Sequence, residues 1–294
     1  KFLRPGRRMR TLAFLLFDHV AGMDTLLYTL ANGGTLIVTR RREPAAILDL
    51  IRRFRVEVLP ASPSFLRLLC LNAETDRHHL EHLKIITYGS EPIDAGTLAR
   101  LNALFPGVRL QQKYGTTETG SPRSVSRDNT SLWMKLSDSR LESRVVDGVL
   151  WIRGEGTILG YLNAPSPIDE HGWYCTGDRV EVDGEWIRFL GRASEMINVG
   201  GEKVSPTEVE MTILELPQVR EALVRGEANA LMGQIVTARV VLDPESNERE
   251  IIRQIRSHCG RRLARYKIPV KIEVATTSLA GDRQKLIRNP RDAL

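Results

Sequence analysis

The sequence has few of the features that mark membrane, secreted or metal-clustered proteins. Its 294 residues include only three cysteines, Cys70, Cys175 and Cys259, which are widely separated. They predict neither a disulfide framework nor a metal-ligand cluster, so we expect all three to be reduced. There is no run of about 18 or more apolar residues, and no small-residue cleavage site follows the basic start. Neither a membrane span nor a secretory signal is indicated, and a cytoplasmic location is expected.

Aromatic residues are also scarce, at 6% of the chain, whereas the formal net charge is +6. Such a basic chain suggests nucleic-acid binding, and arginines do cluster in residues 4–10, 40–55 and 253–267. They alternate there with leucine and isoleucine at helical spacing, and the aromatic residues that could stack on bases are few. The pattern indicates solvated faces of amphipathic helices, and we expect no nucleic-acid partner. A phosphorylated or acidic partner remains an alternative.

The first part of the chain, residues 35–115, alternates short β-branched runs with amphipathic stretches. This alternation is typical of βαβ units around a parallel sheet. The expected strands are 35–39, 56–59, 84–88 and 108–113, and the expected helices are 44–54, one from Ser62-Pro63 through Cys70, and one capped by Asp94. The sequence thus predicts a partial, mostly parallel, doubly wound sheet.

Two of these strands end in polar turns that contain glycine. Gly89-Ser90-Glu91-Pro92 follows one strand, and Tyr114-Gly115-Thr116-Thr117-Glu118 follows the next. Ligands of open parallel sheets bind beyond the carboxyl ends of the strands. We therefore expect the two turns to share one crevice.

The sequence pattern changes twice after residue 120. Asp147-Gly148 and Asp183-Gly184 each separate alternating apolar residues, which predicts β-hairpins in a small antiparallel barrel or sheet. From Ser205 a capping box opens a compact α+β unit with strands at 222–224, 235–242 and 271–274 and a basic helix at 248–264. The expected organisation is a partial α/β subdomain at 1–120, an antiparallel β subdomain at 121–190, a hinge at 191–195 and a mobile α+β domain at 196–294.

Several long motifs follow one another in a fixed order. They are Tyr114-Gly-Thr-Thr-Glu118, Gly172-Trp-Tyr-Cys-Thr-Gly-Asp178, Phe189-Leu-Gly-Arg192 and the stretch from Met196 to Glu210. Together they resemble the adenylate-forming (AMP-binding) superfamily of acyl-CoA synthetases, peptide-synthetase adenylation domains and luciferases. The resemblance extends from about His19 to Lys285. It implies the same multidomain α/β and α+β fold, with a mobile C-terminal domain.

The resemblance implies a nucleotide site made from the two turns. Tyr114 would lie on the adenine of ATP or AMP, with the Gly89-Ser90-Glu91-Pro92 turn on the other side and Gly115 and Thr116 alongside. Thr117 would bond the α-phosphate, and Glu118 would hold Mg²⁺, which prefers carboxylate and phosphate oxygens. The structural alternative for Tyr114 is a half-buried tyrosine at a strand end.

Asp178 and Arg192 complete this implied site. Asp178 would accept both ribose hydroxyls, because a carboxylate offers two acceptor oxygens. Arg192 would donate to the ribose or to the phosphate. A turn or helix cap is the structural alternative for Asp178, although the residues after it read as a strand.

Two weaker matches lie nearer the ends of the chain. His19, in Phe17-Asp18-His19, resembles the histidine that lines the acyl pocket, although many members lack an aspartate like Asp18. Lys285 resembles the catalytic lysine, but Gln284 stands where the family has glycine. The alternatives are a structural histidine and a solvated surface lysine.

Ser194 corresponds to the family's hinge, about which the C-terminal domain swings between two poses. One pose would present Lys285 for adenylation. The other would present the loop that contains Gly200 and Gly201, whose lack of side chains permits close approach of a pantetheine thiol. The basic residues 253–265 would then meet the 3′-phosphate of CoA or an acidic acyl carrier protein.

The implied function is activation of a carboxylic acid by ATP to an acyl-adenylate, followed by thioester formation on CoA or phosphopantetheine. The family's phosphate-binding loop does not occur in the sequence. We therefore expect a fragment of a longer ligase that is incomplete for adenylation alone. A non-catalytic adenylate- or carrier-binding remnant and a peptide-synthetase adenylation domain are the alternatives. The sequence does not indicate the acid, the acceptor or the oligomeric state.

Overall fold

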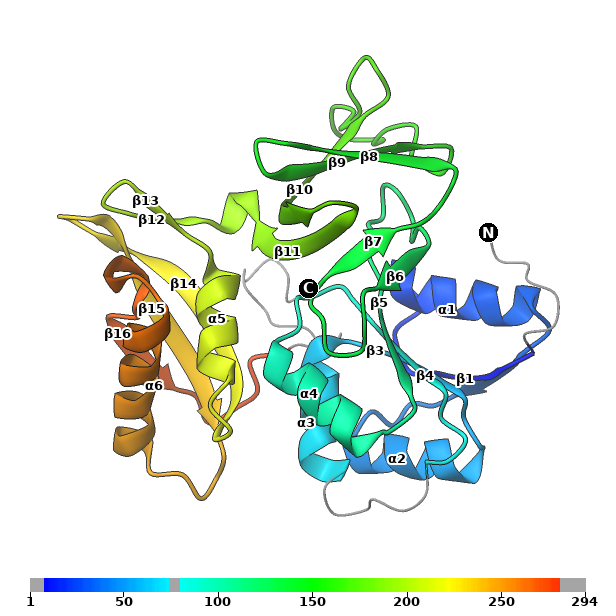
Figure 1. Cartoon of the computed structure of the whole chain (residues 1–294), viewed down its shortest axis with the longest axis horizontal. Helices are drawn as coiled ribbons and strands as arrows, with labels where there is room; N and C mark the ends of the chain where they lie inside the picture. The colour runs from blue at the N-terminus through cyan, green and yellow to red at the C-terminus, as the bar shows by residue number, and fades with distance from the viewer. Residues whose placement is uncertain (1–7, 74–79, 281–294) are drawn as a thin grey trace.

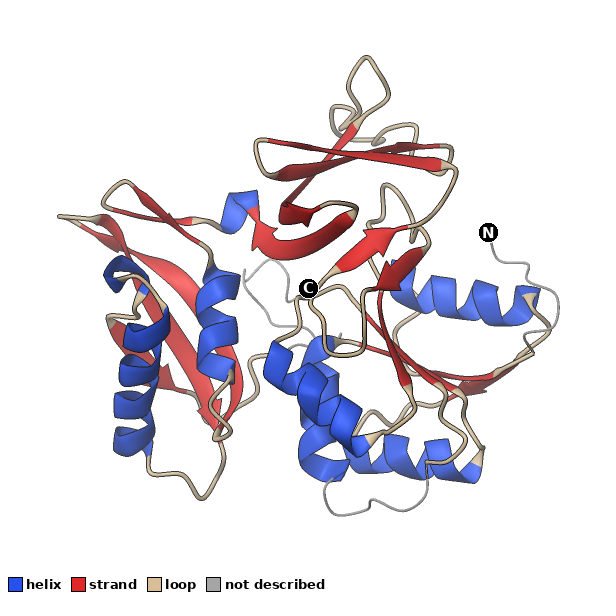
Figure 2. Cartoon of the chain, in the orientation of Figure 1, coloured by secondary structure: helices blue, strands red, loops and turns tan. Residues whose placement is uncertain are grey.

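The computed structural model describes residues 8–73 and 80–280, which form three parts (Figure 1). A parallel sheet with flanking helices comes first, an antiparallel sheet follows it, and a compact unit of helices and strands ends the described chain (Figure 2). None of the described helices is long and apolar enough to cross a membrane.

The first part is built on five parallel strands in the order β2-β1-β3-β4-β5. The strands are β1 (Arg10–Ala13), β2 (Thr35–Val38), β3 (Val58–Ala61), β4 (Ile85–Tyr88) and β5 (Arg109–Gln112). Helix α1 (Val20–Ala31) lies on one side of this sheet, and α2 (Pro44–Arg53), α3 (Pro63–Ala73) and α4 (Ala95–Leu104) lie on the other (Figure 1). The expected parallel sheet is confirmed, whereas β1 and α1 were not predicted.

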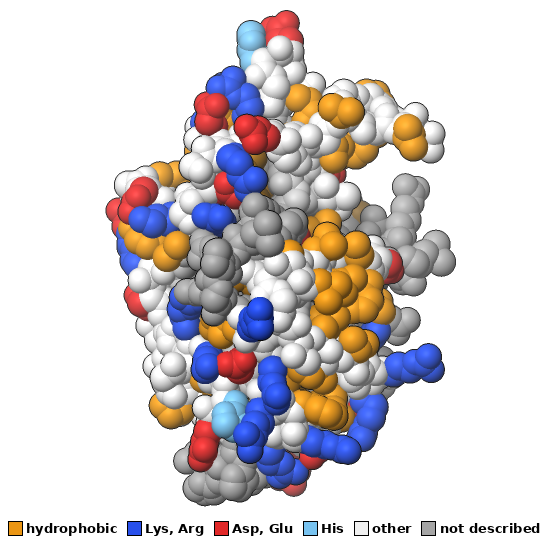
Figure 3. Space-filling model, turned by 90° about the vertical axis from the view of Figure 1, so that its right-hand side faces the viewer, with side chains coloured by type: hydrophobic (Ala, Val, Ile, Leu, Met, Phe, Trp, Pro, Cys, Tyr) orange, Lys and Arg blue, Asp and Glu red, His pale blue; other side chains and the backbone are white. Residues whose placement is uncertain are grey.

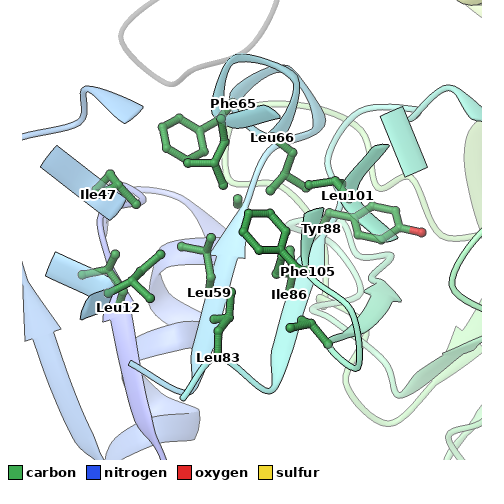
Figure 4. Packing of buried hydrophobic residues seen from close by; sticks show 14 of the residues in the cluster. Leu12, Ile47, Leu59, Phe65, Leu66, Leu83, Ile86, Tyr88, Leu101 and Phe105 are labelled. Carbon is green, nitrogen blue, oxygen red and sulfur yellow. The ribbon is translucent and has the colours of Figure 1, made fainter. Parts of the chain in front are cut away.

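The core of this part lies between the sheet and helices α2 to α4. Leu59 and Ile86 of the central strands meet Phe65 and Leu101 of the helices, and all of them are fully buried (Figure 4). Each fully buried side chain of this size contributes roughly 1.5–3 kcal/mol relative to an exposed one. This packing fixes the positions at which the strands end.

Local hydrogen bonds begin the helices where the sequence predicts them. The Asp94 carboxylate accepts from the backbone N–H of Thr97 at 2.8 Å and also pairs with Arg67 at 2.7 Å. The Ser62 hydroxyl accepts from the N–H of Phe65 at 3.2 Å. These caps satisfy N–H groups that have no partner within the helix.

The second part is an antiparallel sheet with strand order β6-β7-β11-β10-β9-β8. Its strands are β6 (Ser124–Ser126), β7 (Met134–Leu136), β8 (Leu141–Val146), β9 (Val149–Gly154), β10 (Tyr174–Asp183) and β11 (Trp186–Arg192). The β8–β9 hairpin turns at Asp147 and Gly148, whose φ angles of +50° and +74° suit a tight hairpin. The predicted hairpins are therefore confirmed.

The third part packs two helices against a five-stranded sheet. It contains η1 (Ala193–Glu195), β12 (Ile197–Val199), β13 (Glu202–Val204), α5 (Pro206–Leu214), β14 (Val219–Asn229), β15 (Gly233–Leu242), α6 (Glu248–Arg262), η2 (Arg265–Lys267) and β16 (Lys271–Val274). The sheet order is β13-β12-β15-β14, and β16 pairs parallel to β15. Buried Val209, Ile213 and Ile255 join the helices to the sheet. Where a loop was expected around Gly200 and Gly201, β12 and β13 instead form a hairpin.

The antiparallel sheet joins the third part through a close contact at the end of β11. The Ser205 hydroxyl donates to the carbonyl of Leu190 at 2.6 Å. Gly191 has a φ of +114°, and a Cβ added to it would lie 2.8 Å from the Thr207 hydroxyl. A residue with a side chain would therefore be strained at position 191. The proposed hinge residue, Ser194, follows in η1 and is exposed.

Candidate functional site

A cavity of about 590 Å³ lies along the face of the parallel sheet that α1 covers. Its lining extends from Thr11 and Pro60 in the strands to the turns that follow β4 and β5. Most of the predicted site residues line it, namely His19, Gly89, Ser90, Tyr114, Gly115, Thr116, Thr117, Glu118 and Arg192. The face of the molecule on which α1 lies also shows gathered apolar side chains (Figure 3), and Met23, Leu27 and Leu30 of α1 are exposed.

The two glycine-containing turns touch each other at this cavity. A Cβ added to Gly89 would lie 2.4 Å from the carbonyl oxygen of Lys113, so only glycine permits this approach. Ser90 has a φ of +72°, an uncommon conformation for a residue with a side chain. A Cβ on Gly115 would lie 2.7 Å from the carbonyl of Gly120. The glycines thus let two strand ends share one crevice.

Tyr114 is held from two directions. Its hydroxyl donates to Oδ2 of Asp178 at 2.7 Å, and its ring stacks on Phe189 with centroids 4.6 Å apart and an interplanar angle of 16°. The other oxygen of Asp178, Oδ1, pairs with Nε of Arg192 at 3.1 Å. Asp178 and Arg192 face each other across β10 and β11, so strand pairing sets this geometry. Asp178 lies behind two residues that line the cavity.

Burial controls the protonation of this cluster. It raises the pKa of Asp178 above its ordinary value, although Tyr114 and Arg192 oppose the rise. Burial, together with the neighbouring Asp178 carboxylate, also raises the pKa of Tyr114. Tyr114 is therefore a neutral hydrogen-bond donor at physiological pH. A carboxylate has further lone pairs beyond these two contacts, so Asp178 can still accept from a ligand hydroxyl.

Glu118 is held at the other end of the same turn. The Tyr161 hydroxyl donates to Oε1 of Glu118 at 2.6 Å, and the N–H of Ile158 donates to the Glu118 carbonyl at 2.8 Å. Burial alone would raise the pKa of Glu118, but the hydrogen bond from Tyr161, with smaller contributions from Thr116 and Tyr174, holds it below the ordinary value. Glu118 is therefore an anion at physiological pH.

This donor set fits a cation that is shared with a ligand. Among the residues that the structure describes, no three His, Cys, Asp or Glu side chains gather into a metal cage. Mg²⁺ is commonly held by one or two carboxylates together with substrate phosphates. A single anionic carboxylate on the cavity wall satisfies that requirement.

Other predicted residues lie away from the cavity lining. Glu91 accepts from the Ser64 hydroxyl at 2.8 Å at the start of α3, and Pro92 follows it outside the lining. Gly200 and Gly201 form the turn of the β12–β13 hairpin in the third part. Lys285 lies outside the described residues.

Sequence reasoning missed two contributors, Phe189 and Tyr161. Phe189 begins the Phe189-Leu-Gly-Arg192 motif, but the sequence did not predict that its ring would stack on Tyr114. Tyr161 follows Gly160 in an exposed loop, and no local pattern connects it with Glu118. Both contacts join residues that are far apart in sequence.

Comparison with known proteins identifies the family of the chain. Residues 3–162 match the profile of the AMP-binding enzyme family, and residues 208–282 match that of the AMP-binding enzyme C-terminal domain. Acyl-CoA synthetase 7 of Caenorhabditis elegans is 31% identical over 94% of this chain and 54% of its own length. The long-chain-fatty-acid–CoA ligase FadD13 of Mycobacterium tuberculosis is 31% identical over 96% of this chain and 58% of its own length.

Solved structures also match the chain. A crystal structure of the anthranilate CoA ligase AuaEII in complex with anthranoyl-AMP aligns with a TM-score of 0.81 and 26% identity. That alignment covers 92% of this chain and 56% of the ligase. The chain thus spans about half the length of the relatives it matches. Because one profile alone matches more than half of the sequence, the chain belongs to the AMP-binding enzyme family.

Proposed function

We propose that the cavity binds adenylate, and that the protein activates a carboxylic acid with ATP and transfers the acyl group to a thiol. One observation carries the proposal: the Tyr114–Glu118 turn, His19 and Arg192 line a single cavity. Each is matched to the family by its own motif, yet they come from three separate regions of the chain. Their convergence supports a nucleotide and an acid that bind side by side.

The nucleotide half of the site follows from the contacts around Tyr114. The aromatic ring offers a flat apolar surface to a purine. The Tyr114 hydroxyl donates to Asp178, which holds the ring in place. The Asp178 carboxylate has further lone pairs that can accept from ribose hydroxyls. Arg192 is more than half exposed on its side chain, so its guanidinium can also reach a phosphate.

The phosphate half of the site lies at Thr117 and Glu118. Thr117 is exposed, and its hydroxyl is available to the α-phosphate. Glu118 would hold Mg²⁺ jointly with phosphate oxygens. When bound, Mg²⁺ would neutralise negative charge on the phosphates. Lys285, the proposed catalytic lysine, would offset charge that develops on the reacting carboxylate and phosphate.

His19 supports the acid half of the site. It lines the cavity, and its Nδ1 accepts from the N–H of Ala21 at 3.3 Å, where α1 begins. This cap orients the imidazole at the cavity wall, where we propose that the carboxylate of the acid binds.

We propose CoA as the thiol acceptor. Its 3′-phosphate requires cationic side chains, and Arg253, Arg256 and Arg261 are exposed on α6. Gly200 and Gly201 would border the pantetheine. An acyl carrier protein is the alternative acceptor, and it would meet the same face.

The nucleotide site can be tested by calorimetric titration of AMP into the wild-type chain and the Asp178→Asn variant, alongside melting curves. Loss of a charged acceptor for the ribose should weaken AMP binding by about 1.5–3 kcal/mol. A variant with lower stability but unchanged AMP affinity would make Asp178 a purely structural residue.

The reaction requires a second experiment. A pyrophosphate-release screen of fatty, aryl and amino acids, with CoA as acceptor, should identify the acid when it is run on a protein that contains these residues together with the family's phosphate-binding loop. AMP binding without pyrophosphate release from any acid, in a protein that does contain the phosphate-binding loop, would instead favour a non-catalytic nucleotide-binding role.

A further inference from the structure

The loop of residues 155–173, between β9 and β10, is attached to Glu118 at two points. The Tyr161 hydroxyl donates to Oε1 of the Glu118 side chain at 2.6 Å, although 43 residues separate the two in sequence. The N–H of Ile158 donates to the Glu118 backbone carbonyl at 2.8 Å. Side chain and backbone of one residue thus both receive contacts from this loop.

The tip of the loop is otherwise open to solvent. Leu159 and Leu162, on either side of Tyr161, are fully exposed, with relative exposures of 103% and 102%. Tyr161 is 44% exposed, so its hydrophobic burial does not explain its position. The hydrogen bond to Glu118 is therefore the contact that places this side chain.

The bond also restricts the carboxylate. A free glutamate side chain rotates, and ordering it on ligand binding costs conformational entropy. Tyr161 occupies one oxygen and so restricts the rotation of this carboxylate. A preordered carboxylate binds a cation more tightly than a freely rotating one.

We propose that Tyr161 is a positioning residue: its hydroxyl holds Oε1 of Glu118 so that Oε2 is offered to a cation bound with the nucleotide, and it ties the 155–173 loop to this carboxylate. The cation part of this inference rests on the proposed function, whereas the attachment of the loop does not. Two measurements separate these parts.

The first measurement is calorimetric titration of AMP at increasing MgCl₂ concentrations. Tyr161→Phe removes only the hydroxyl. We expect the Mg²⁺ concentration that gives half of the maximal increase in AMP affinity to rise by about 3–10-fold. A fully buried hydrogen bond to a charged group would give a larger rise, but Tyr161 is partly exposed. Leu162→Ala, in the same loop, is the matched control and should leave the value unchanged. An unchanged or lower value in Tyr161→Phe would overturn the positioning role, and a lower one would identify Tyr161 as a competitor of the cation.

A double variant tests whether Tyr161 acts through Glu118. In the Glu118→Gln background, Tyr161→Phe should produce no further change in Mg²⁺ dependence, because the group that it positions has lost its charge. Additive effects of the two substitutions would contradict the inference.

The second measurement is hydrogen exchange of the loop amides without nucleotide or metal. Exchange across residues 157–163 should be about 3–10-fold faster in Tyr161→Phe than in the wild type, and unchanged in Leu162→Ala. Equal exchange in Tyr161→Phe and wild type would overturn the attachment. AMP binding by the wild type without any Mg²⁺ dependence would contradict both the metal role of Glu118 and the proposal that Tyr161 orients it for a cation. The hydrogen-exchange result would still show whether Tyr161 attaches the 155–173 loop to Glu118.

Discussion

Two tyrosine–carboxylate hydrogen bonds connect the Tyr114–Gly120 segment to the antiparallel part of the chain. They are nearly equal in length, at 2.7 Å for Tyr114–Asp178 and 2.6 Å for Tyr161–Glu118. Their surroundings differ, because the acceptor Asp178 is buried whereas the acceptor Glu118 is only partly buried and its donor, Tyr161, is 44% exposed. Two hydrogen bonds of nearly equal length can therefore contribute different free energies to folding.

The difference follows from the cost of an unsatisfied buried group. A buried acceptor that loses its donor keeps the full desolvation penalty, whereas an exposed one is hydrated at once. The Asp178 contact is also supported by Arg192 and by the stacking of Tyr114 on Phe189. We infer that the buried contact fixes the architecture of the cavity and that the exposed one can adjust to a ligand.

Asp178→Ala should produce the largest effect. It leaves the Tyr114 hydroxyl and the Arg192 guanidinium without their shared acceptor, so we expect the free energy of unfolding to fall by about 2–3 kcal/mol. Urea denaturation followed by tryptophan fluorescence measures the change. Glu245→Ala, an exposed carboxylate in the turn between β15 and α6, is the control and should change stability by less than about 0.5 kcal/mol.

Tyr114→Phe should have the next largest effect, about 1–2 kcal/mol on unfolding. The ring remains on Phe189, but the buried Asp178 loses its donor. The same denaturation assay applies. Stability equal to the wild type would show that Arg192 or water replaces the hydroxyl, and the contrast between the two contacts would disappear.

Phe189→Leu isolates the stacking contribution. Leucine retains apolar volume but loses the aromatic pair, which is worth about 0.5–1.5 kcal/mol beyond area burial. We expect a loss of stability in that range and a weaker AMP affinity, because Tyr114 loses the surface that orients its ring. Urea denaturation measures the loss of stability, and calorimetric titration of AMP on the same preparation measures the affinity. Lower stability with unchanged AMP affinity would contradict the proposal that Phe189 orients the Tyr114 ring.

Tyr161→Phe should have the smallest effect on global stability, no more than about 0.5 kcal/mol, because both partners are accessible to water. Denaturation measured beside Tyr114→Phe makes the comparison direct. If both variants lost the same free energy, burial would not be the property that distinguishes the two contacts.

The sequence predicts what short-range interactions determine. The Asp94 cap and the Asp147-Gly148 turn lie where local rules place them, because the partners are within a few residues. Strand β16 at 271–274 was also predicted from its own residues, although its pairing partner β15 is distant in sequence. Helix α1 was not predicted, although Met23, Leu27 and Leu30 have helical spacing, and in the structure these apolar residues are exposed.

Contacts between distant segments could not be predicted in this way. The motifs identified Tyr114, Glu118 and Asp178 as a group, but not the bonds that hold them. Tyr161 reaches Glu118 only after a loop between two strands has folded back, and Phe189 reaches Tyr114 through the pairing of β10 with β11. Such contacts depend on the register of a sheet, which single positions do not reveal.

The junction at the end of β11 also limits how the molecule could be recombined with its relatives. Gly191 has no side chain where Thr207 approaches, and Ser205 bonds the neighbouring Leu190 carbonyl. In a chimera of two related proteins, a junction between positions 191 and 205 would take these contacting residues from different parent proteins. A residue larger than glycine at position 191 would then collide with the threonine at position 207. Residues 190–207 therefore form a block that a functional chimera should inherit whole.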